Sequence, residues 1–151
     1  MYKNIFFFVV LLLTTTSSFS GDFKGAKRIK FLNYPDCIEL KNSAGTTAVL
    51  SHHVGGRVLS YRKNNEESLF IADNEREWKP DGSKKPSSAG RFDIGPEYLI
   101  PKRKELWSGK WISTIIGPRS ARLESKESKD AGIRLIREFI LDEKSSHLIC
   151  K

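Results

Sequence analysis

Arginine, carboxylate and tryptophan side chains gather between residues 89 and 111, in the stretch AGRFDIGPEYLIPKRKELWSGKW, which shows no helical period. In an extended chain Arg91 and Asp93 lie on the same side, because alternate residues of a strand share a face. The Gly95-Pro96 turn can bring Glu97 back toward them. A guanidinium beside carboxylates can hold sugar hydroxyls through paired, directional hydrogen bonds. The three charged residues are therefore candidates for saccharide binding, and an internal salt bridge that pins the loop is the equally weighted alternative.

Aromatic and basic residues follow in the same stretch. Trp107 and Trp111 lie on either side of Gly109, and an indole ring can pack against the apolar face of a sugar. We expect at least one of the two rings to pack in the core beneath the loop instead. The run from Lys102 to Lys104 is the largest local excess of positive charge. A solvated loop is the favoured interpretation of this run, and a site for an acidic saccharide or a cell-surface polyanion is the alternative.

A second group of candidates surrounds the glycine pair Gly55-Gly56. Glycine tolerates positive φ and lets a neighbouring strand or a ligand approach the backbone, and a tight hairpin is favoured over ligand contact here. His52 and His53 precede the pair at the end of a predicted strand, where neighbouring side chains point to opposite faces. At most one histidine can then face a groove. His53 and Arg57 are retained as candidate substrate-binding residues, with an ordinary polar role at the strand end as the favoured alternative for the histidine.

Short apolar alternations separated by turn signals must position these residues, and almost nothing follows the helical period. The segments CIELKNSAG and TTAVLSHH flank a turn at residues 42–45 and predict a β-hairpin, with Ile38 and Leu40 on one face. Residues 133–143, IRLIREFILDE, alternate as a strand does; residues 134–143 also fit a helix, but the β-branched content favours the strand. Residues 72–88 are polar and aperiodic, which predicts an exposed excursion between sheet segments. The spacing of the strands predicts an all-β antiparallel β-sandwich.

The N-terminal residues 1–20 are typical of a signal peptide, with a basic Lys3, an apolar run and small polar residues before Gly21. The apolar run is too short to span a bilayer, which takes about 20 residues. We therefore expect a secreted or periplasmic protein whose mature domain comprises residues 21–151, with no membrane contact after the signal is removed. The closing segment SSHLICK begins a further predicted strand, and this indicates that the domain is incomplete in this chain.

Composition narrows the classes of partner. The net charge of +8 is basic, but acidic and basic residues interleave along the chain, whereas a nucleic-acid-binding protein clusters its basic residues. No Cys-x-x-Cys or His-x-x-x-His spacing occurs, so neither a metal nor a cofactor is predicted. Export permits a disulfide between Cys37 and Cys150, at even odds with two free thiols. Oligomeric state is left open by the sequence.

Three stretches together carry a resemblance to a known family. The run VLSHHVGGRVLSYRKNNEESLF, residues 49–70, resembles the entry to galactose mutarotase-like domains, in which two strands flank a Gly-Gly or Gly-Ala turn. The runs AGRFDIGPE, residues 89–97, and LWSGKWISTIIGPRSARLES, residues 106–125, are similar to a domain of unknown function within that superfamily. The resemblance extends over residues 36–151 and corresponds to the N-terminal part of such a domain.

The resemblance implies a β-supersandwich with a carbohydrate groove on one sheet. Mutarotases of this superfamily use a glutamate base on the anomeric hydroxyl and a histidine acid near the ring oxygen, and both come from later in the family's chain. Catalytic residues are therefore not identified here, and His147 lies in no matching motif. The expected function is that of an exported carbohydrate-binding or carbohydrate-processing protein related to aldose epimerases. A non-catalytic sugar-binding or surface-interaction module on the same fold is the alternative, because a fold does not determine a function.

Overall fold

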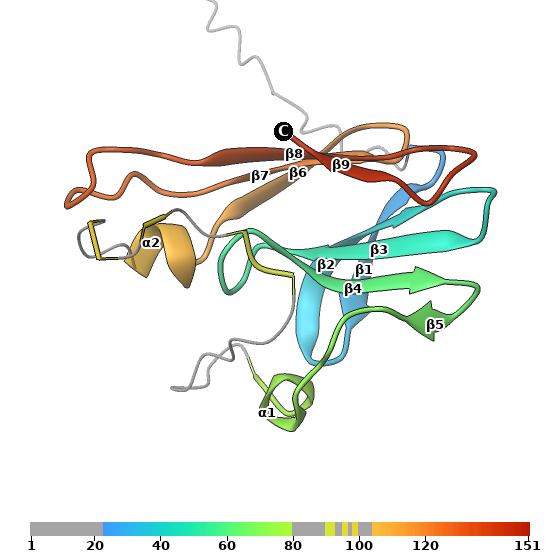
Figure 1. Ribbon diagram of the computed structural model, residues 1–151, viewed down its shortest axis with the longest axis horizontal. Helices are drawn as coiled ribbons and strands as arrows, with labels where there is room; N and C mark the ends of the chain where they lie inside the picture. Colours follow the sequence, from blue (N-terminus) through green and yellow to red (C-terminus); the bar gives the residue numbers. More distant parts are fainter. Residues whose placement is uncertain (1–22, 80–89, 93–94, 97, 100–103) are drawn as a thin grey trace, which may run out of the picture.

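Two antiparallel β-sheets pack against one another in the computed structural model, which describes residues 23–79, 90–92, 95–96, 98–99 and 104–151 (Figure 1). The predicted all-β antiparallel sandwich is confirmed. Helix is confined, in these ranges, to α1 (Asp73–Arg76) and α2 (Lys104–Trp107), of four residues each. The predicted signal peptide lies outside the described residues, and no helix within them is long and apolar enough to cross a membrane.

The first sheet has the order β1-β2-β3-β4-β5, so each strand pairs with its neighbour in sequence. Its strands are β1 (Ala26–Phe31), β2 (Tyr34–Lys41), β3 (Thr46–Ser51), β4 (Arg57–Lys63) and β5 (Glu66–Glu67). The predicted hairpin is confirmed, because β2 and β3 pair with Ile38 opposite Leu50. The side chain of Asn42 stabilises its turn by accepting a hydrogen bond of 2.8 Å from the Thr46 N–H.

The second sheet has the order β6-β7-β8-β9 and is again a meander. Its strands are β6 (Ile112–Gly117), β7 (Ser120–Glu124), β8 (Ile136–Leu141) and β9 (Leu148–Cys150). β8 confirms the strand prediction for residues 133–143 over the helical alternative, and β9 confirms the strand expected in the closing segment. On the outer face of this sheet, a bridge of 2.6 Å joins Arg122 to Glu138 across the β7–β8 pair.

The core between the sheets is built from the inward residues of both. Phe139 and Leu141 alternate along β8 and are buried against Ile38 and Leu40, which the sequence places on one face of β2. The cluster is completed by Ala26, Ala48, Leu50, Val58, Trp111, Ala121 and Leu123. Full burial of a Leu, Ile or Phe side chain contributes about 1.5–3 kcal/mol, so this interface is the main source of the sandwich's stability.

A second apolar cluster covers the other face of the first sheet. Tyr34, Cys37 and Leu59 pack there with Trp78, which follows α1 in the sequence. Figure 1 shows α1 beyond this face of the first sheet. The prediction that residues 72–88 form an exposed excursion holds for most of their described part, where five of the eight residues at 72–79 are exposed, but not for Glu75 and Trp78, which are buried. Polar composition did not reveal the burial of Glu75, because its charge is balanced by an ion pair with Arg57 of the sheet.

The two cysteines lie in different layers of the fold and are both free thiols. Cys37 belongs to the cluster on the far face of the first sheet, whereas Cys150 packs against the core between the sheets. Burial raises the pKa of the Cys37 thiol to about 12, which keeps it protonated and unreactive at neutral pH. The disulfide alternative is therefore not realised in this structure.

Candidate functional site

A small notch opens where the two sheets, α2 and the segment around residue 91 meet. Its described walls are Val54, Gly55, Gly56, Arg57, Arg91, Phe92, Leu106, Trp107 and Arg137. The cavity between these residues has a volume of about 10 Å³, which is close to the minimum for one water molecule and far too small for a sugar ring. A saccharide at this place would therefore lie over the rim of the notch, against the exposed side chains.

Arg91 and Trp107 form the rim, as the sequence suggested they could. The guanidinium of Arg91 lies 4.5 Å from the centre of the Trp107 ring. Its Nη1 donates a hydrogen bond of 2.8 Å to the Trp107 carbonyl oxygen. The indole keeps 38% of its surface exposed, so an aromatic group and a cation are presented together at the surface.

Glycine is required at positions 55 and 56, because the end of α2 and the segment after it lie close to the backbone there. Gly55 has a φ of +73°, and a Cβ at this position would lie 2.6 Å from the Trp107 carbonyl oxygen. Its N–H donates to the carbonyl oxygen of Gly109 at 2.8 Å. A Cβ on Gly56 would lie 2.3 Å from the Trp111 ring. The close approach predicted for this pair is confirmed, and the neighbour is protein.

Trp111 packs in the core, as expected for one of the two tryptophans. Its side chain is only 2% exposed. The indole N–H donates to the Glu105 carbonyl oxygen at 3.0 Å, and the backbone N–H donates to the His52 carbonyl oxygen at 2.7 Å. Trp111 therefore anchors α2, which carries Trp107, to the core.

Arg137 is a member of the notch that sequence reasoning missed. It extends from β8 and donates to the carbonyl oxygens of Gly56, at 2.5 Å, and of Phe92. Its guanidinium also lies 4.7 Å from the Trp111 ring centre. A signal was present, because Arg137 alternates with Phe139 in a strand whose matching side is otherwise apolar. An arginine at an inward position must find partners, and here it joins the two sheets.

Arg57 directs its charge away from the notch, into a buried ion pair with α1. Its Nη2 lies 2.5 Å from Glu75 Oε1, and both side chains are almost completely buried. The hydroxyl of Tyr34 donates to Glu75 and accepts from Arg57 at 3.1 Å. Burial and the hydrogen bond to Glu75 raise the pKa of Tyr34. Arg57 thus fastens α1 to the sheet, and its partners Tyr34 and Glu75 were not among the sequence candidates.

His52 and His53 lie beyond the end of β3, so the alternation expected for strand residues does not apply. Their rings lie 4.1 Å apart. Burial lowers the pKa of His52 to about 4. Arg28 donates to Ser113 Oγ at 2.7 Å, which directs the serine hydroxyl toward His52 Nδ1 at 2.9 Å and favours the neutral imidazole. His53 Nε2 donates to the Pro35 carbonyl oxygen at 2.5 Å.

The sequence candidates are therefore only partly brought together. Arg91 and Trp107 meet at the rim, whereas His53 lies against Tyr34 and Trp78 on the other face of the first sheet. Asp93 and Glu97 lie outside the described residues. Within the described ranges, no group of three or more histidine, cysteine, aspartate or glutamate side chains is placed to hold a metal ion.

Comparisons with known proteins identify no relative of this chain. No protein-family model, no curated protein and no solved structure matches this chain.

Proposed function

We propose that this chain is an exported saccharide-binding domain of the mutarotase-like kind, which binds its sugar over the rim formed by Arg91 and Trp107. The observation that carries the proposal is the stacking of the Arg91 guanidinium on an indole ring that remains 38% exposed. A half-exposed indole offers an apolar face to a pyranose ring. The guanidinium beside it supplies charged hydrogen-bond donors for sugar oxygens. Export is supported by the sequence of residues 1–20.

Two sets of hydrogen bonds hold the backbone beneath the rim in a fixed conformation. The Gly55 and Gly109 backbones are joined by a hydrogen bond of 2.8 Å beneath the rim. Arg137 joins the Gly56 and Phe92 backbones from the other sheet. A binding surface held by the scaffold loses little conformational entropy when a ligand binds.

An enzyme that processes a sugar needs an acid and a base, whereas a protein that only binds the sugar needs neither. General acid–base catalysis requires titratable groups within hydrogen-bond reach of the anomeric centre. The described walls of the notch are arginine, aromatic, glycine and aliphatic residues, with no carboxylate or histidine among them. We therefore favour binding, and retain an aldose-epimerase activity as the alternative.

Calorimetric titration of the full chain with hexoses and oligosaccharides tests the proposal. Trp107→Ala is expected to weaken binding by about 0.5–1.5 kcal/mol or more, the scale of a lost aromatic packing partner. Phe70→Ala is the matched control, because Phe70 is an exposed aromatic elsewhere, with 78% of its surface accessible. Equal affinities in the Trp107 variant and the parent would refute the site. Polarimetry of the α and β anomers with the same protein distinguishes catalysis from binding alone.

A further inference from the structure

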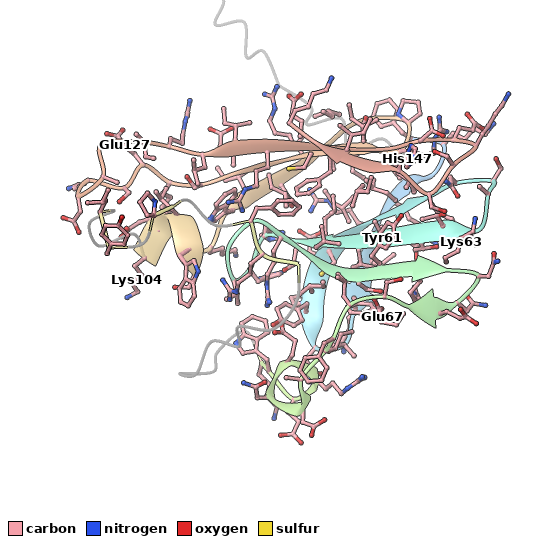
Figure 2. All side chains as sticks on the ribbon, viewed as in Figure 1. Tyr61, Lys63, Glu67, Lys104, Glu127 and His147 are labelled. Carbon is pink, nitrogen blue, oxygen red and sulfur yellow. The ribbon has the colours of Figure 1, made fainter. Side chains whose placement is uncertain are left out.

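A second recess lies on the other flank of α2 from the notch. It has a volume of about 220 Å³ and is lined by Lys104, Glu105, Gly109, Lys110 and Lys126, and we name it the lysine hollow. Its lysines come from three separate parts of the chain, namely the start of α2, the loop before β6 and the loop after β7. Figure 2 shows the Lys104 side chain extending from α2 away from the sheets.

The described walls of the lysine hollow carry more positive than negative charge. Lys104, Lys110 and Lys126 form no ion pair with any residue in the described ranges, and Glu105 is the only carboxylate among the described walls. Glu127 follows Lys126, but Figure 2 places it on the far side of the β7–β8 connection from Lys104 in that view. Other basic residues in the second sheet and its connections do have acidic partners, such as Arg119 with Glu143, Arg122 with Glu138 and Arg134 with Glu124.

The field of Lys110 reaches the neighbouring histidines. Burial is the main reason that the pKa of His53 is lowered, and the charge of Lys110 lowers it further. An uncompensated group of like charges around a recess raises the local concentration of anions.

We propose that the lysine hollow binds the anionic group of an acidic saccharide, a carboxylate or a sulfate ester. The inference rests on the proposed function and deepens it by naming the ligand class. Lysine ammonium groups are flexible point charges with three donors each, and they can pair with the oxygens of either anionic group without requiring a fixed orientation. A volume of about 220 Å³ is below the roughly 300–1,000 Å³ of pockets that enclose a whole small molecule, so a single substituent is the expected occupant.

The positions of the two recesses fit one ligand. Lys104 and Glu105 line the lysine hollow, whereas Leu106 and Trp107 line the notch, so the four residues of α2 form the wall between them. Gly109 lines the lysine hollow and accepts the hydrogen bond from Gly55 at the notch. A sugar ring on Trp107 can therefore carry an acidic unit around α2 to the lysines.

Calorimetric titration of the full chain with three oligosaccharides of equal length, one neutral, one uronate and one sulfated, tests this inference. The double variant Lys110→Gln/Lys126→Gln is expected to weaken binding of an acidic oligosaccharide about tenfold and to leave the neutral one unchanged. The control Lys30→Gln/Lys144→Gln removes the same net charge from exposed lysines elsewhere. Comparison of the two acidic ligands identifies the preferred anionic group. Circular dichroism checks that both double variants keep the β-sheet signature.

The outcomes separate the two proposals. An equal loss in the hollow and control variants would mean that overall charge attracts the ligand, and this would overturn the inference. Neutral and acidic ligands binding equally well, with no effect of the lysine substitutions, would overturn it while the proposed function stands. Loss of acidic binding in the lysine variant with full binding by Trp107→Ala would support the lysine hollow and refute the sugar site over the notch.

Discussion

The Arg91 guanidinium packs 4.5 Å from the centre of the Trp107 ring and donates a hydrogen bond to that residue's own carbonyl oxygen. One arginine thus contacts both the side chain and the backbone of the tryptophan at the end of α2. The contact fixes the position of the ring, while 38% of the Trp107 surface stays exposed. A fixed and exposed aromatic group beside a cation is the arrangement from which the saccharide site is inferred.

Arg91→Ala is expected to weaken saccharide binding by about 1–3 kcal/mol, because a charge-assisted hydrogen bond is lost. Arg76→Ala removes an exposed arginine from α1 and should leave the affinity unchanged. Isothermal titration calorimetry measures both, and circular dichroism checks the fold. Unchanged affinity in the Arg91 variant, or loss of its β-sheet signal, would assign Arg91 a purely structural role.

Gly55→Ala should destabilise the fold by more than the cost of placing an alanine at a positive φ, because the added Cβ also meets a backbone oxygen. Gly132 has a similar φ of +66° but open space around its Cβ position, whereas a Cβ on Gly55 would lie 2.6 Å from a backbone oxygen. Gly132→Ala is expected to cost about 1 kcal/mol and Gly55→Ala about 2 kcal/mol or more in the free energy of unfolding. Urea denaturation of both variants tests this difference. Equal costs would mean that the loop after α2 moves freely away from Gly55.

Breaking the buried pair of Arg57 and Glu75 should be far more costly than breaking a surface pair. Arg57→Met leaves Glu75 buried without its guanidinium partner, and we expect a loss of about 3–5 kcal/mol in the free energy of unfolding. Arg122→Met removes an exposed pair with Glu138 and should cost about 1 kcal/mol or less. Chemical denaturation measures both losses.

A double variant tests whether the unpaired buried carboxylate causes the loss of stability. Arg57→Met/Glu75→Leu removes both buried charges and should recover most of the stability lost in the single variant. A double variant as unstable as Arg57→Met would show that the position of α1 depends on the ion pair itself.

Stability should fall as the pH falls from about 6.5 to about 4, because of His52. Burial lowers its folded pKa from 6.5 to about 4, so the unfolded state binds more protons over this window and stability rises with pH. The difference corresponds to at most about 3 kcal/mol, at 1.36 kcal/mol for each pKa unit. Urea midpoints between pH 4 and pH 7 measure the effect. His52→Asn should have a smaller pH dependence, and an equal dependence in both proteins would remove His52 as the cause.

Strand positions were predictable because alternation is a local property of the chain. Ile38 and Leu40 share a face in any strand, and a hairpin turn of residues 42–45 then sets the partner strand. The sequence predicted that at least one of the rings of Trp107 and Trp111 packs in the core, but it did not indicate which one. The ring of Trp111 packs directly against Gly56, where a Cβ would lie 2.3 Å from the ring.

The buried polar contacts were not predictable in the same way. α1 has four residues and therefore no period, and the burial of Glu75 depends on Arg57 in a distant strand and on Tyr34 in another. Arg137 likewise acquires its role from Gly56, which lies in the connection between β3 and β4 of the other sheet. Such contacts follow from the packing of the sheets, which local sequence patterns do not specify.

The most direct test follows the indole N–H signals of the three tryptophans by ¹⁵N nuclear magnetic resonance while a saccharide is added. Trp107 is 38% exposed, whereas Trp78 and Trp111 are 7% and 2% exposed. A sugar bound over the rim should shift the Trp107 signal in proportion to occupancy and leave the two buried signals in place. An unchanged Trp107 signal under conditions in which calorimetry detects saccharide binding would contradict the proposed site.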